Sequence, residues 1–144
     1  VAAGPAEAER AVAARAVPRP IARVADPGRA GALLHCRLRY FDPDRRRAGI
    51  PEDVAALVDT MTDQQVAVTL VNVSQSSART VVVQTGAYGE HQCTTLLVDD
   101  QEIEVDHPWF TIHLEPGTGA RLVVNTERYV NQPSFAFPWG SFGK

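Results

Sequence analysis

Four carboxylates alternate along one short segment, in a pattern that could serve a metal ion. They are Asp100, Glu102, Glu104 and Asp106, separated by single residues. In an extended strand they would share one face, and Ca²⁺ prefers oxygen ligands of this kind. Side chains on one strand face stand roughly 6.6–7 Å apart, however, so they do not converge on one ion. We therefore favour a solvated strand edge whose like charges oppose aggregation, and we expect no metal or other cofactor.

Residues for acid–base or nucleophilic catalysis are present without a diagnostic spacing. The four histidines form neither an H-x-H nor an H-E-x-x-H pattern, and the serines at 74–77 lack a Gly-x-Ser-x-Gly elbow. A glycosidase needs two carboxyls about 5–10 Å apart across a cleft, and no spacing here identifies such a pair. We expect no catalytic residues and no enzyme activity from this chain alone. A small hydrolase remains the third of three hypotheses.

The C-terminal tail carries the candidate binding residues. Four of the ten aromatic residues lie in the last ten positions, and three of them alternate along an extended segment stiffened by prolines. The candidates are Tyr129, Phe135, Phe137 and Trp139. Such rings could stack on sugars, fill a groove on another subunit or cover the chain's own sandwich. We favour the last of these three roles.

The two cysteines allow two interpretations. Cys36 and Cys93 both fall on apolar faces of expected strands. A disulfide between them would close a long loop and contribute on the order of 4 kcal/mol on the entropy model. Two buried thiols acting as small hydrophobic side chains are the alternative. The sequence leaves both open.

Short strands are the elements that must position these residues. Alternation from Leu34 to Tyr40 predicts a half-buried first strand. Further strands are expected at Val66–Val73, Arg79–Gln84, Gln92–Val98, Glu102–Asp106, Phe110–Leu114 and Ala120–Asn125. Turn residues such as Asp99-Asp100 separate them. The fold class is therefore all-β, an antiparallel β-sandwich of about seven strands.

One short helix and an N-terminal arm complete the expected organisation. Pro51-Glu52-Asp53 followed by apolar residues at helical spacing predicts a helix at about 51–61. Residues 1–32 are rich in Ala, Pro, Gly and Arg, with a marginal helix over Ala6–Val17, and predict an irregular, partly helical arm or linker. The sandwich is expected at 33–128 and the aromatic tail at 129–144.

The middle of the chain resembles a known family. The order "VAVTLVNVS", "RTVVVQTGAYGEH", "VDDQEIEVD" and "FTIHLEPGTGARLVV" is similar to the C-terminal β-sandwich domain of glycoside hydrolases of the α-amylase type. In that family a Leu-x-Pro-Gly hairpin precedes the last strand, as Leu114–Gly117 does here. The similarity covers about residues 65–125. It implies a noncatalytic module that stabilises a neighbouring catalytic domain or binds sugar weakly.

Composition and charge narrow the choice of partners. The 144 residues carry a net charge of -3, but residues 1–47 hold ten Arg against five acidic residues, and the remainder is acidic. Opposite patches of this kind favour docking within the chain or between copies. The dilution of the Arg by Ala and Pro argues against nucleic acid as a partner. No apolar run is long enough for a membrane span, and we expect no membrane partner.

Two functions from different classes are therefore the favoured hypotheses for this chain. The first is a noncatalytic accessory module, expected to be the C-terminal part of a larger secreted carbohydrate-active protein, extracellular or periplasmic, whose partner is a catalytic domain or carbohydrate. The second is a self-assembling structural subunit, an oligomer or filament held by the basic arm and the aromatic tail. The chain begins at Val1 and its only Met is Met61, so we expect a processed product or a fragment.

Overall fold

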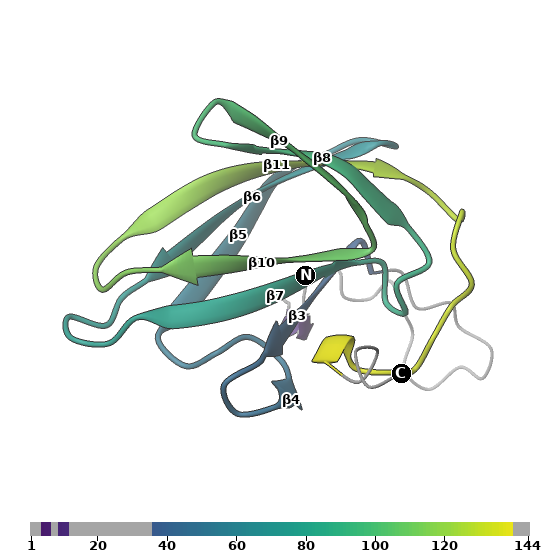
Figure 1. Ribbon diagram of the computed structural model, residues 1–144. Helices are drawn as coiled ribbons and strands as arrows, with labels where there is room; N and C mark the ends of the chain where they lie inside the picture. Colours follow the sequence, from purple (N-terminus) through teal and green to yellow (C-terminus); the bar gives the residue numbers. More distant parts are fainter. Residues whose placement is uncertain (1–3, 7–8, 12–35, 140–144) are drawn as a thin grey trace.

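Two packed antiparallel sheets form the body of the protein (Figure 1). The computed structural model describes residues 4–6, 9–11 and 36–139. The nine strands of the two sheets are β3 (Leu38–Asp42), β4 (Arg47–Ala48), β5 (Val54–Met61), β6 (Gln65–Asn72), β7 (Arg79–Thr85), β8 (Gln92–Val98), β9 (Gln101–His107), β10 (Trp109–Leu114) and β11 (Gly119–Glu127). The all-β sandwich expected from the sequence is confirmed.

The order of strands in each sheet differs from their order in the chain. The four-stranded sheet runs β10-β7-β3-β4, and the five-stranded sheet runs β5-β6-β11-β8-β9. The last strand, β11, thus lies in the middle of its sheet, between two strands that precede it. The tight turn between β8 and β9 has positive φ at both Asp99 (49°) and Asp100 (73°). Two-residue hairpin turns of this kind match the twist of the strands that they join.

Aliphatic side chains from both sheets fill the interior. Leu70, Leu122 and Val124 from the five-stranded sheet meet Val81 and Val83 from the four-stranded sheet, and all five are 0% exposed. Alternation along the strands produces this core, because successive side chains point to opposite faces. Residues between those positions form the two outer faces, where candidate binding groups lie.

The segment expected as a helix at about 51–61 is strand β5 instead. β5 pairs with β6, and its register shifts between Val58 and Thr60. The inward side chains of Val54, Ala56 and Val58 keep the two-residue alternation, and exposed apolar residues on the outer face of the strand produce the spacing that imitates a helix. Leu57 and Met61, expected on a buried helix face, are 66% and 56% exposed. β5 is therefore the apolar edge strand of the five-stranded sheet.

Only part of the N-terminal arm is described. β1 (Gly4–Ala6) and β2 (Glu9–Ala11) pair with each other in a two-stranded sheet. Glu9–Ala11 therefore does not belong to the helix expected over Ala6–Val17, and the remainder of the arm lies outside the described residues. The same holds for residues 33–35, at the start of the expected first strand. In the described part that strand is β3, which begins at Leu38.

Candidate binding surface

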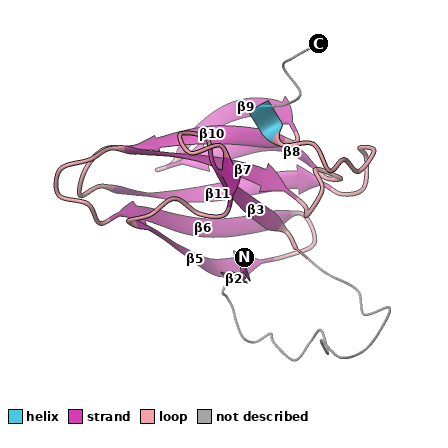
Figure 2. Ribbon diagram, turned by 90° about the horizontal axis from the view of Figure 1, so that it is seen from below, coloured by secondary structure: helices cyan, strands magenta, loops and turns pink. Residues whose placement is uncertain are grey.

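The C-terminal tail packs along the sandwich. From the end of β11 it passes the loop between β7 and β8 and ends beneath β3, in a single helical turn at residues 138–139 (Figures 1 and 2). Two backbone hydrogen bonds attach it to that loop. Asn131 N–H donates to the Glu90 carbonyl (3.1 Å), and Ser134 N–H donates to the Tyr88 carbonyl (2.9 Å). The Asn131 side chain also donates to Gln92 Oε1 (2.8 Å).

A buried histidine anchors the start of the tail. His91 is 2% exposed, and its Nδ1 accepts the backbone N–H of Tyr129 at 3.0 Å. Its backbone carbonyl accepts a hydrogen bond from Asn131 Nδ2 (3.1 Å). Burial lowers the pKa of His91; the nearby Glu90 carboxylate raises it, and the positive charges of Arg128 and Arg37 lower it further. The imidazole is therefore neutral, with its proton on Nε2, as the hydrogen bond to Nδ1 requires.

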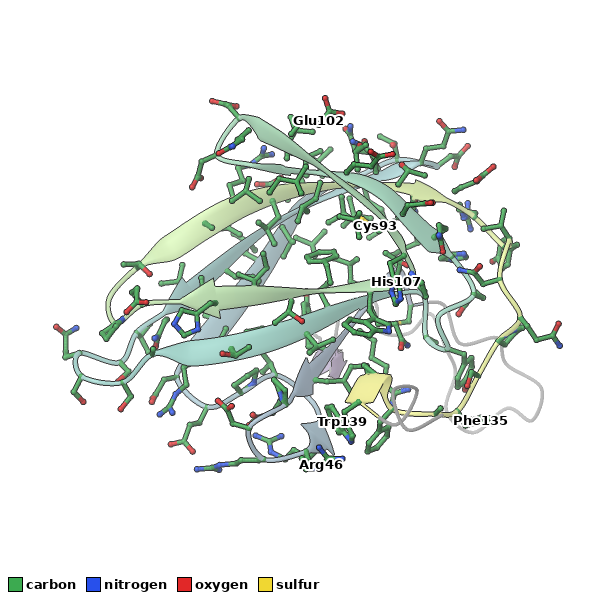
Figure 3. All side chains as sticks on the ribbon, in the orientation of Figure 1. Arg46, Cys93, Glu102, His107, Phe135 and Trp139 are labelled. Atoms are coloured by element: carbon green, nitrogen blue, oxygen red, sulfur yellow. The ribbon has the colours of Figure 1, made fainter. Side chains whose placement is uncertain are left out.

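The end of the tail covers an aromatic side chain on the outer face of β3. The Phe41 ring lies 5.6 Å from that of Phe137 and 5.9 Å from that of Trp139, between ring centroids. Because of this cover Phe41 is only 1% exposed, although it points away from the core. The Arg46 guanidinium lies 5.4 Å from the Trp139 ring centroid, on the solvent side (Figure 3).

The other two aromatic residues in the described part of the tail are largely exposed. Phe135 makes an edge contact with Tyr88 at 5.2 Å between centroids, yet it is 86% exposed. Tyr129 contacts His91 edge-on and is 64% exposed. The three alternating rings thus contact two separate parts of the sandwich instead of sharing one face. The tail covers its own sandwich and also presents aromatic surface to solvent.

Two arginines from distant parts of the chain meet near the start of the tail. Arg37 precedes β3, and Arg128 follows β11. Burial and the charge of Arg128 lower the pKa of Arg37. Arg37 Nη2 donates to the Asp63 backbone carbonyl (3.2 Å), and Arg128 Nη1 lies 3.9 Å from Asp63 Oδ1. Neither arginine, nor His91, was singled out in the sequence, because no local pattern connects positions so far apart.

An open depression lies beside Arg128. Its volume is about 660 Å³, and it lies where β6, β8 and β11 meet at one end of the sandwich. The lining is polar and consists of Asp63, Gln64, Thr94, Thr126, Glu127 and Arg128. Hydroxyl, amide and charged groups of this kind suit a ligand rich in hydroxyl groups.

The alternating carboxylates do not form a metal site. Asp100 lies in the hairpin turn, and a register shift where β9 pairs with Cys93–Thr95 displaces Asp106, whose φ is 49°. Asp106 Oδ1 instead accepts a hydrogen bond from Gln92 Nε2 (3.2 Å). Within residues 36–139, no three His, Cys, Asp or Glu side chains are arranged to hold a metal ion. Glu102 and its neighbours lie at the exposed top of the molecule (Figure 3).

The cysteines are both free thiols, so the disulfide that the sequence allowed is not formed in the structure. Cys36 precedes β3 of one sheet, and its Sγ donates to the Leu38 carbonyl (2.9 Å). Cys93 lies on β8 of the other sheet, 0% exposed within the core. Burial raises the pKa of Cys36 to about 11 and that of Cys93 to about 12.

One side-chain relay between β7 and the end of β10 has the connectivity of a nucleophile, base and carboxylate. Thr80 Oγ1 lies 3.1 Å from His113 Nδ1, and His113 Nε2 lies 3.1 Å from Glu115 Oε2. The His113 and Glu115 side chains are 56% and 68% exposed, so bulk water reaches the relay. Catalysis of this type is strongest in a site that excludes water, whereas these two side chains are open to solvent.

Comparison with known proteins gave no match to a family model, to a curated protein or to a solved structure. Across the described residues, no helix has the length and apolar character needed to cross a membrane.

Proposed function

We propose that this chain is a noncatalytic β-sandwich module of a larger secreted carbohydrate-active protein, acting outside the cytoplasm beside a catalytic domain. The observation that carries the proposal is the docked tail with its solvent-exposed rings. Phe135 is 86% exposed although the tail is hydrogen-bonded to the sandwich on its N-terminal side. A large exposed ring on a fixed backbone is typical of a binding surface. The resemblance of residues 65–125 to glycoside hydrolase C-terminal domains supports the same function.

Carbohydrate is the ligand that this surface fits best. Aromatic rings stack on the apolar faces of sugar rings, and adjacent polar groups orient the hydroxyls. Here Phe135 and Tyr88 supply the rings, and Gln132 and Ser134 lie beside them on the tail. The apolar interior of the sandwich then acts as a rigid support that keeps the tail in place.

Binding to a panel of soluble neutral and acidic oligosaccharides tests the proposal. We expect at least one sugar to bind and Phe135→Ala to weaken that binding, with the folded state unchanged because the ring is exposed. Leu57→Ala is the matched control, since Leu57 is 66% exposed on the opposite sheet. If none of the sugars binds, or if both variants weaken binding equally, the carbohydrate function is wrong.

Self-assembly is the second candidate, favoured by the separation of charge. The acidic residues of the β8–β9 hairpin form no ion pair with another described residue; they are Asp99, Asp100, Glu102, Glu104 and Asp106. Glu102 and Arg46 lie at opposite ends of the molecule (Figure 3). Copies could therefore associate head to tail through opposite charges. Sedimentation at low and high salt tests this, because a monomer at both excludes it.

A further inference from the structure

The corner where Arg37 and Arg128 come together holds two positive charges, with one described carboxylate within 4.0 Å of them. In the described part of the chain, Asp63 is the one carboxylate within 4.0 Å of Arg128, and no carboxylate lies that close to Arg37. The Asp63 side chain is fully exposed, so water screens its contribution. The Nε atoms of both arginines are buried without a hydrogen-bond partner. Both guanidinium groups are thus held against the protein, close enough to repel each other.

A strained tyrosine lies in the same corner. Tyr129 has φ of 59°, a backbone conformation that bulky residues rarely adopt. The hydrogen bond from its N–H to His91 holds it there, and its ring remains 64% exposed. The Arg128 guanidinium lies 5.2 Å from the ring centroid, so ring and charge form one surface. Strain of this kind is retained mainly where the surrounding structure fixes a functional side chain.

We propose that the corner formed by Arg37, Arg128 and Tyr129 binds an acidic saccharide. Its oxyanion, a uronate carboxylate or a sulfate ester, lies between the two guanidinium groups, and its ring packs on Tyr129. The polar depression beside Arg128 receives the hydroxyls of the neighbouring sugar unit. This inference rests on the proposed carbohydrate function and adds to the Phe135–Tyr88 surface a second contact site, which specifies an acidic ligand class.

Planar guanidinium groups suit such a ligand because they donate parallel hydrogen bonds to carboxylate and sulfate oxygens. An oxyanion between the arginines also removes their mutual repulsion. Asp63 opposes binding, since its carboxylate approaches the same Arg128 nitrogen that the ligand needs. The site therefore predicts opposite effects for two neighbouring substitutions. Arg128→Gln weakens binding, and Asp63→Asn strengthens it.

Isothermal titration calorimetry with four matched tetramers tests the inference on the full chain. The probes are a galacturonate tetramer, a sulfated tetrasaccharide, neutral maltotetraose and tetraglutamate. We expect one or both acidic sugars to bind, and which of them does so identifies the oxyanion. Arg128→Gln should reduce that affinity about tenfold. The matched control is Arg121→Gln, because Arg121 lies near the start of β11, where it is paired with Asp59 of β5, and the affinity of this variant should stay within about twofold of that of the unmodified chain.

Tyr129→Asn separates binding from folding. Asn tolerates positive φ, so this variant should keep the melting temperature while it loses the stacking surface. Binding of maltotetraose alone overturns the inference and leaves the carbohydrate function intact, whereas absence of binding to every sugar removes both. Equal binding of tetraglutamate, or equal effects of Arg128→Gln and Arg121→Gln, shows general charge attraction and overturns the inference as well.

Discussion

Replacing Phe41 by alanine tests whether the tail is part of the folded domain. Phe41 is 1% exposed and contacts Phe137, Trp139 and the Arg39 guanidinium, 4.9 Å from its ring centroid. Removal of a buried Phe ring commonly costs about 3–5 kcal/mol. Because Phe41 faces the tail and not the inter-sheet core, the tail can partly refill the space, and we expect about 3 kcal/mol.

Thermal and urea unfolding measure this loss directly. For a domain of this size, about 3 kcal/mol corresponds to a decrease of roughly 12 °C or more in melting temperature. Trp139 should become more exposed in Phe41→Ala, with a red shift of its fluorescence. The same substitution in a Trp139→Phe background, which leaves Trp109 as the sole Trp, should show no such shift. This comparison assigns the signal to the tail.

A double-mutant cycle decides whether the two rings interact. Phe41→Ala and Trp139→Ala should be coupled by about 0.5–1.5 kcal/mol, the range for an aromatic pair. Additive effects, together with a loss below about 1 kcal/mol for Phe41→Ala, would refute the packing of the tail on β3. The rings of the tail would then be available to stack on a sugar or to fill a groove on another subunit.

Three further predictions concern pH, cysteine reactivity and backbone strain. Burial lowers the folded-state pKa of His91 below 6.5, so the contribution of His91 to stability is present above that pH and is lost as the pH falls. The urea midpoint should therefore drop less between pH 7.5 and 5.5 in His91→Gln than in the unmodified chain. Cys36 and Cys93, with pKa values of about 11 and 12, should resist alkylation at pH 8 in the folded protein. Both should react in urea without reductant. If mass spectrometry finds either cysteine unlabelled in urea, the two thiols are not free. Gly86→Ala should lower stability by about 1–3 kcal/mol, since φ is 86° and a Cβ would lie 2.5 Å from Glu90 Oε1; an unchanged melting temperature would show that no strain is present.

The sequence predicts the regular strands well because each has two independent local signals. Gln92–Val98 agrees with β8 at both ends, since alternation inside the strand is joined to Asp99-Asp100, a strong turn signal. β5 also has this alternation, but its exposed apolar residues Leu57 and Met61 add a helical spacing to it. A periodicity argument then assigns the segment to the wrong period.

The candidate surface is harder to predict, since its contacts join distant positions. His91 and Tyr129 are separated by 38 residues, and nothing near either one marks the other as its partner. The tail composition draws attention to the aromatic residues but cannot assign each ring to its contact. The approach of Arg37 to Arg128 depends on the fold as a whole, because Arg37 precedes β3 in one sheet and Arg128 follows β11 in the other.

The central position of β11 bears on how the chain folds as it leaves the ribosome. β6 and β8 cannot be joined until residues 119–127 have emerged, because β11 hydrogen-bonds to both. Until then the nascent chain holds two separate hairpins, β5–β6 and β8–β9, each with an open edge that can pair wrongly. The five-stranded sheet is therefore completed only after β11 has emerged, and chains that terminate before β11 are the forms most prone to aggregate.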